Sequence, residues 1–232
     1  MKKAVLCFIF ILLLIRPGHP AFQEIEQAGA RVIGLGYAFT GLADDINAML
    51  INPAGIMNLS SFTFSLSSAA LYPGLDNANN FKGNIQAVYP LKSLPSFLSR
   101  MNLGAGFGFL YTEYYKENLV HLSAAYRINE RVSTGLNLKL LAWSGQVVSL
   151  FKETKGDYSA TALSLDLGLQ YTISDFLKFG MSFQDVNQPD ISSSSSPSRE
   201  KMPVDYRFGL GFKSSKMAFD VDLGYCEDLL TE

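Results

Sequence analysis

The sequence predicts an all-β protein, an antiparallel transmembrane β-barrel with a short helical segment at its N-terminal side. Three observations predict this class. Apolar and polar residues alternate along most of the chain after residue 61. All but one of the alternating segments are roughly nine to twelve residues long, close to the 9–11 that a tilted strand needs to cross a bilayer. An apolar N-terminal leader indicates export.

The amino-acid composition limits which partners and cofactors are expected. Charged residues make up 17% of the 232 residues, below the roughly 25% of a soluble domain. The formal net charge is -2, so the chain lacks the basic balance typical of nucleic-acid binding, and no nucleic acid is expected as a partner. After the leader, the chain keeps a single cysteine, Cys226, and a single histidine, His121. We therefore expect no internal disulfide, no metal site and no cofactor.

The first residues predict the compartment. Lys2 and Lys3 precede an apolar run at 4–15, which is too short for a spanning helix. A small residue, Ala21, follows it at a suitable cleavage position. Residues 1–21 therefore predict a Sec signal peptide. Together with the strands, this leader predicts the outer membrane of a Gram-negative-type cell as the final location.

Residues 22–60 form a compact unit between the leader and the first strand. Glycines crowd residues 29–41, so irregular or closely packed backbone is expected there. Asp44 is a suitable N-cap for a short helix with Asp45 in its first turn, a simpler reading than a catalytic or calcium pair. Pro53 ends that helix, because it biases the preceding residue away from helical geometry. The apolar face of this helix is formed by Ile46, Met49 and Leu50.

Strands fill the chain from residue 61 to residue 232. The period of two is clearest at 161–172, where leucines alternate with small or polar residues. About nine such segments follow one another, at 62–72, 81–89, 101–111, 119–128, 131–142, 161–172, 178–184, 204–213 and 217–225. One face is bulky and apolar, and the other carries Gly, Ser, Asn, Lys and Asp. Lipid would contact the first face and a hydrated lumen the second.

The connections alternate in length. Tight turns are expected at 129–130, 174–175 and 214–215, and long polar loops at 73–80, 144–158 and 189–202. Short turns at one end and long loops at the other are the plan of an outer-membrane barrel. A soluble periplasmic β-protein also shows alternating strands, so it stays open as an alternative. The uniformly bulky faces favour the barrel.

Charged residues also occur on the predicted lumen face. They lie on neighbouring strands and have both signs: Lys139, Asp166, Lys178, Asp205, Arg207, Asp220 and Asp222. A lumen lined by one sign of charge would indicate ion selection. The mixture of signs instead predicts internal ion pairs that neutralise buried charge.

Two patterns that could indicate nucleotide binding or catalysis are incomplete. Gly34 and Gly36 lack the third glycine of a dinucleotide fingerprint, because Phe39 stands in its place, and no βαβ pattern surrounds them. His121 shares a face with Ser123, but residues two apart on one strand are about 7 Å apart. That spacing alone does not form a catalytic pair. We therefore predict that the protein is not an enzyme.

The N-terminal unit carries a family resemblance in four short pieces: 29–31 (GAR), 34–39 (GLGYAF), 42–45 (LADD) and 52–55 (NPAG). These pieces resemble the N-terminal signature of the FadL-like outer-membrane barrels, and most closely the PorV/PorQ branch. Pieces of the strand region are also similar to that family, at 126–140, 183–189 and 203–212. The strands themselves are generic, so the N-terminal signature is the distinctive part.

The resemblance implies a hatch, a segment folded inside the barrel near its periplasmic end. The corresponding motif residues here are Asp44, Asp45, Asn52, Pro53, Ala54 and Gly55. FadL-like transporters pass hydrophobic molecules such as long-chain fatty acids, whereas PorV relatives are partners in type IX secretion. The implied partners are outer-membrane lipid and either a hydrophobic small molecule or secretion-system proteins.

The family has about fourteen strands, an even number as closed bacterial barrels require. This chain ends at Glu232 without the aromatic residue that marks a last barrel strand. We therefore expect an incomplete wall of about nine strands, truncated on its C-terminal side. The expected division is a signal peptide at 1–21, a hatch segment at 22–60 and barrel strands at 61–232.

Overall fold

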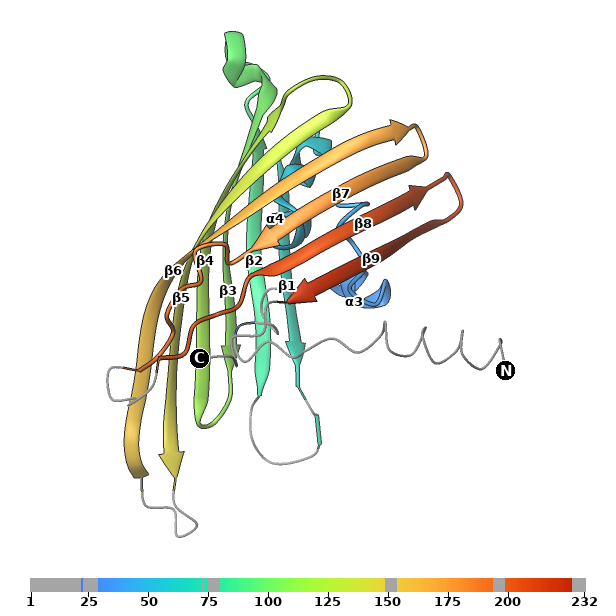
Figure 1. Ribbon diagram of the computed structural model, residues 1–232. Helices are drawn as coiled ribbons and strands as arrows, with labels where there is room; N and C mark the ends of the chain where they lie inside the picture. Colours follow the sequence, from blue (N-terminus) through green and yellow to red (C-terminus); the bar gives the residue numbers. More distant parts are fainter. Residues whose placement is uncertain are drawn as a thin grey trace.

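A computed structural model describes residues 22, 29–71, 73–74, 80–148, 154–193 and 199–226. The predicted leader at 1–21 and parts of three predicted loops lie outside these residues. The described chain forms one antiparallel sheet in which each strand pairs with the next along the sequence. The sheet curls, and its last three strands run at a steep angle to the first ones (Figure 1).

The nine strands of this sheet confirm the predicted class. They are β1 (Thr63–Ala70), β2 (Phe81–Pro90), β3 (Met101–Tyr111), β4 (Tyr115–Arg127), β5 (Val132–Val148), β6 (Thr154–Ser174), β7 (Leu177–Gln184), β8 (Asp205–Lys213) and β9 (Ala218–Cys226). Within the described residues, β1 pairs with β2 alone and β9 with β8 alone. The described sheet is therefore a curved wall with two free edges.

The wall buries polar side chains on its inner face and exposes apolar side chains on its outer face, the reverse of a soluble protein. On β5, Leu138 and Leu140 are 39% and 44% exposed, whereas Lys139 between them is 1% exposed. The same inversion holds on β4, where Leu122 is 56% exposed and His121 is fully buried. Soluble proteins seldom bury lysine while exposing leucine. An apolar outer face and a polar inner face fit strands that stand in lipid.

The inner face holds residues 29–58, called the docked segment below. It contains α3 (Ala30–Gly34), α4 (Ala48–Ile51) and the 3-10 helix η1 (Pro53–Asn58). The sheet curls around these short helices (Figure 1). Their apolar side chains form one buried cluster with residues of β2 and β4: Val32, Phe39, Leu42, Ala43, Ile46, Ala48, Met49, Ile51, Ile56, Met57, Val88 and Ala125. None of the described helices is long and apolar enough to cross a membrane.

The predicted helix start is wrong. Asp44 caps no helix, and α4 begins at Ala48 with Asn47 as its N-cap residue. Asp45 Oδ1 instead accepts a bond from the Asn47 amide (2.9 Å), and both carboxylates turn toward Arg31. Salt bridges to a distant cation thus override the local capping preference. The glycine-rich stretch expected to be irregular contains α3, which the sequence reasoning missed.

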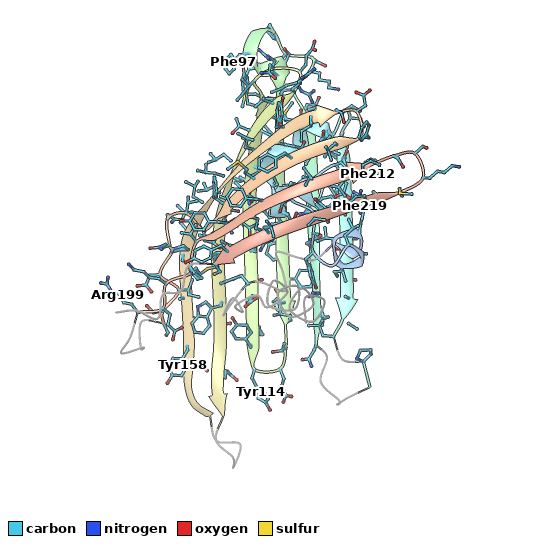
Figure 2. All side chains as sticks on the ribbon, turned by 45° about the vertical axis from the view of Figure 1, so that its right-hand side comes forward. Phe97, Tyr114, Tyr158, Arg199, Phe212 and Phe219 are labelled. Carbon is cyan, nitrogen blue, oxygen red and sulfur yellow. The ribbon has the colours of Figure 1, made fainter. Side chains whose placement is uncertain are left out.

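The two ends of the wall differ from the prediction in detail. The turn end carries the connections at 91–100, 128–131, 175–176 and 214–217, and the loop end carries the others. Phe97 lies at the turn end, while Tyr114, Tyr158 and Arg199 lie at the loop end (Figure 2). The turn end includes the ten-residue connection 91–100 with the 3-10 helix η2 (Ser96–Arg100), and the loop end includes the short connection 112–114.

The long loop predicted at 144–158 is also wrong. β5 and β6 continue through most of it and reach 17 and 21 residues. Their backbones stay paired beyond the apolar band, with Ser144 opposite Ser159 and Gly145 opposite Tyr158. Alternation of apolar and polar residues reveals only the part of a strand whose outer face is apolar. Backbone pairing continues beyond that part, into sequence that is largely polar on both faces and shows no such alternation.

Candidate functional site

Glycines of the wall let the backbone of the docked segment approach closely. Gly180 of β7 faces the Thr40 carbonyl, and Gly211 of β8 faces the Leu42 amide. A Cβ atom at either glycine would overlap the segment backbone. The same is true at Gly135, Gly168 and Gly209, whereas a Cβ atom at Gly104 would overlap the Met49 side chain of the segment. The segment therefore lies on glycines of β3, β5, β6, β7 and β8.

Polar side chains of the wall donate to the carbonyls of the segment. Ser182 Oγ donates to Ile51 O (2.5 Å), and Gln184 Nε2 donates to Leu50 O (2.6 Å). Further donors are Asn102 to Ile56 and to Leu59 just after the segment, Arg127 to Met57, Ser133 to Ala54, and Gln170 to Gly41 and Leu42. Buried carbonyls need such partners. The inner face therefore supplies donors to an irregular chain that secondary structure does not satisfy.

Two carboxylates of β9 bind four consecutive amides of the segment at 39–42. Asp222 Oδ2 accepts from the first two at 3.1 Å each. Asp220 Oδ2 accepts from the next two at 2.9 and 2.8 Å. Bonds to an ionised acceptor are about twice as strong as neutral ones. These carboxylates, predicted as lumen charges, thus hold the docked segment against the last described strand.

Replacing both carboxylates, as Asp220→Asn with Asp222→Asn, is expected to loosen the segment by about 2–4 kcal/mol. The amide side chains keep an oxygen acceptor but lose the charge that strengthens the four bonds. The measurement is the rate at which a protease cleaves the segment in detergent. Asp175→Asn, an exposed carboxylate in the β6–β7 turn, serves as the control. Equal cleavage rates in the double variant and the control would contradict this role.

Asn52 is the central contact of the NPAG motif. Its side chain is fully buried; Nδ2 donates to Thr40 O (2.9 Å) and Leu169 O (3.1 Å), and Oδ1 accepts from the Ala54 amide (3.3 Å). Asn52 thus joins two parts of the segment to β6. The next three residues are buried in η1, where Pro53 and Ala54 face wall glycines and Gly55 faces the segment itself.

Asp44 and Asp45 form an ionic cluster at the turn end. Arg31 Nη1 lies 2.5 Å from Asp44 Oδ1 and 2.7 Å from Asp45 Oδ2. Asp44 also pairs with Lys213 at the end of β8. Burial raises the pKa of the Asp44 carboxyl, but the hydrogen bonds and charges of Arg31 and Lys213 outweigh it and hold that pKa below its ordinary value. The cluster therefore ties α3 to the wall.

Acid is expected to loosen this cluster. Because the pKa of Asp44 is lower in the folded protein, its pairing contributes fully above the ordinary value of 3.8 and is lost as the pH falls through the lowered pKa. A fluorescent dye on Gly34→Cys, in open space on α3, should report the change below about pH 4. Asp44→Asn should remove that step. An unchanged titration in this variant would contradict the assignment.

The other predicted lumen charges also lie on the inner face. Lys139 Nζ contacts Asp166 Oδ1 (2.9 Å) and Asp185 Oδ1 (2.8 Å), and all three side chains are at most 2% exposed. Arg207 pairs with Asp205 on the same strand (2.5 Å). Lys178 donates to Asn58 Oδ1 of the docked segment (2.6 Å). The structure therefore places these five charges in contacts with the wall or the segment.

Sequence reasoning missed several residues of this site. Asp185 follows β7 with a positive φ of 56°, and no pattern marked it as a partner of Lys139. Asn58 donates to Gly55 O and to Gln170 Oε1. Small polar residues on an inner face are expected in any barrel, so their alternation could not show which of them bind the segment.

His121 and Ser123 do not form a catalytic pair. Ser123 Oγ donates to Asn137 Oδ1 (2.9 Å) on β5. Among the residues that the structure describes, neither ring nitrogen of His121 has a hydrogen-bond partner. The described residues also contain no group of three His, Cys, Asp or Glu side chains that could hold a metal ion.

Fold and site together define an antiparallel β-barrel wall with a segment docked on its polar face. No known protein family matches the sequence, and no curated protein matches it. Among solved structures, the chain is similar to the CymD monoaromatic hydrocarbon channel, with a TM-score of 0.59 and 15% sequence identity. The similarity covers 87% of this chain and 69% of that channel. At this identity the likeness shows the fold.

Proposed function

We propose that the protein is an outer-membrane transport barrel of the FadL-like type that passes hydrophobic small molecules. The observation that carries this proposal is the inverted wall: leucines such as Leu138 stand exposed on the outer face, while Lys139 is buried on the inner face beside Asp166 and Asp185. Such a wall is stable where lipid covers the apolar side. The docked segment is the hatch in this proposal.

An apolar patch on the inner face supports a hydrophobic substrate. Leu119 and Leu141 are fully buried on β4 and β5, and they pack with Leu110 of β3 and Leu50 of the segment. Ile191 and Met202, from the connection after β7, belong to the same cluster. This patch lies between the docked segment and the loop end. Leu50, Ile191 and Met202 cover it, so in this proposal it would contact an apolar solute once these residues move aside. The mixed charges of the inner face do not favour an ion.

Uptake by intact cells tests the proposal. Cells whose outer membrane carries the chain should take up a labelled monoaromatic hydrocarbon faster than cells without it. Leu141→Asn, which adds a polar group to the inner patch, should slow this uptake about tenfold. Ser144→Asn, on the outer face of the same strand, is the matched control. Uptake that does not depend on the chain would contradict transport.

A second function is favoured by the close fit of the segment. Its backbone contacts the wall glycines and bonds to Ser182, Gln184 and Asp220, so opening a path would break many interactions. A PorV-like barrel that serves as a partner in protein secretion needs no such path. This alternative predicts that envelope proteins co-purify with the chain in mild detergent and that hydrocarbon uptake is unchanged.

Membrane extraction separates both functions from a soluble periplasmic protein. The exposed outer leucines and the leader predict that the mature chain stays in the outer-membrane fraction after carbonate washing. Release of the chain into the wash would contradict both membrane proposals. The leader itself predicts removal near residue 21, which N-terminal sequencing of the mature protein would show.

A further inference from the structure

A groove crosses the outer face of the wall near the turn end. It has a volume of about 560 Å³ and spans β2 to β5. Three alanines form its floor: Ala87, Ala105 and Ala124. Larger apolar side chains stand around them, among them Tyr89, Leu103, Leu122 and Leu138. Small residues on neighbouring strands therefore open a hollow in an otherwise bulky face.

The dimensions of the groove suit a lipid chain. Its lining extends over three residue positions along each strand, or about 10 Å, and crosses four strands, or about 15 Å. The groove begins near the last residues of β2 and the first residues of β3. With the proposed membrane location, this end of the strands lies near one boundary of the bilayer hydrocarbon. One leaflet contributes about 15 Å of that hydrocarbon. An acyl chain that descends from the surface at this end can enter the hollow.

Two cations lie at the surface end of the groove. The Arg100 guanidinium stacks 5.5 Å from the ring centroid of Tyr126, which points outward two residues beyond Ala124, and it donates to Ile128 O. Lys92 follows β2 and donates to Ser60 O (3.1 Å). Both side chains are exposed. Each keeps further N–H donors for a ligand.

The connection between β2 and β3 also has the composition of a segment that lies at a membrane surface. Leu94 and Phe97 are 44% and 60% exposed there, between the two cations in sequence. Exposed apolar residues beside basic ones are typical of segments at the lipid headgroup level. The next turn carries Glu130 and Arg131, whose charges offset each other. The charge beside the groove is therefore positive.

We propose that this groove binds one anionic phospholipid, with its headgroup at the surface end where Arg100 and Lys92 lie and an acyl chain over the three alanines. The proposal rests on the proposed membrane location, because the groove must face lipid. A phospholipid matches both parts of the site at once: the chain matches the apolar hollow, and the headgroup charge matches the cations at its surface end.

Native mass spectrometry of the full chain tests the site. The protein is reconstituted with equal amounts of phosphatidylglycerol and phosphatidylethanolamine, then transferred to detergent, and the retained lipid is identified. Lys92→Gln with Arg100→Gln should lower the retained phosphatidylglycerol about tenfold. Ala124→Leu, which fills the groove from the lipid side, should lower it as well. The matched controls are Lys216→Gln, a turn-end cation beside β9, and Ala142→Leu, an outer alanine beyond the groove.

Retention of phosphatidylglycerol by the wild type and both controls, with loss in both groove variants, would support the site. Equal retention in all variants, equal retention of phosphatidylethanolamine, or a membrane-inserted wild type without bound lipid would each overturn it. A chain that fails to enter the membrane would instead overturn the proposed function. Heat-dependent gel mobility of every variant shows whether its strands are assembled.

Discussion

Gly180→Val is expected to release the docked segment from the wall. A side chain on Gly180 would overlap the Thr40 carbonyl and approach Asn52 Nδ2, which lies 3.0 Å from the Cβ position. Neither side can give way easily, because β7 is paired on both edges and Asn52 is fully buried. Overpacking of such a contact costs about 3 kcal/mol. The strands should stay paired while the segment detaches from the inner face.

Protease digestion in detergent measures this release. The segment should be cut rapidly in Gly180→Val, while the strand region remains protected. Gly34→Val is the matched control, because Gly34 has open space around it and no unusual backbone angle. A segment equally protected in Gly180→Val and the control would show that the close contact at β7 does not hold it.

Lys139→Met is expected to destabilise the wall itself. Lys139 bridges Asp166 and Asp185, and the three side chains are at most 2% exposed. Removing the cation leaves two carboxylates buried side by side without their partner. Loss of one member of a buried charge pair costs about 3–5 kcal/mol. The thermal unfolding temperature in detergent should therefore fall.

A triple variant separates lost charge balance from lost packing. Adding Asp166→Asn and Asp185→Asn to Lys139→Met removes the unpaired charges, so much of the stability should return. Asparagine suits position 185, where φ is positive at 56°. If the triple variant were no more stable than Lys139→Met, the ion cluster would not be the cause of the loss.

The strands and their two faces could be predicted from the sequence, because apolar residues recur at every second position wherever the outer face is apolar. At β5, Leu136, Leu138 and Leu140 show at once where the strand lies and which way it faces. The extension to Val148 could not be predicted, because pairing there depends on the neighbouring β6 and not on apolar residues. The same limit hid the early start of β4 at Tyr115.

The contacts of the docked segment could be predicted only in outline. The family resemblance pointed to Asn52 and Asp44, but their partners lie far along the chain, on β6 and β8. The capping prediction for Asp44 used local sequence alone. In the structure its carboxylate instead pairs with a cation from another element, Lys213 of β8. Likewise, six glycines on five strands read in the sequence as ordinary small residues of the inner face, whereas in the structure they face the docked segment.

Labelling of single cysteines in intact cells tests most directly whether the wall spans the outer membrane. Phe97→Cys, Tyr114→Cys and Tyr158→Cys are each made with Cys226→Ser, and a maleimide that cannot cross membranes is added. The two loop-end positions, Tyr114 and Tyr158, should react in intact cells (Figure 2). Phe97, at the turn end, should react only after the outer membrane is opened. Equal reaction at both ends in intact cells would contradict a spanning barrel.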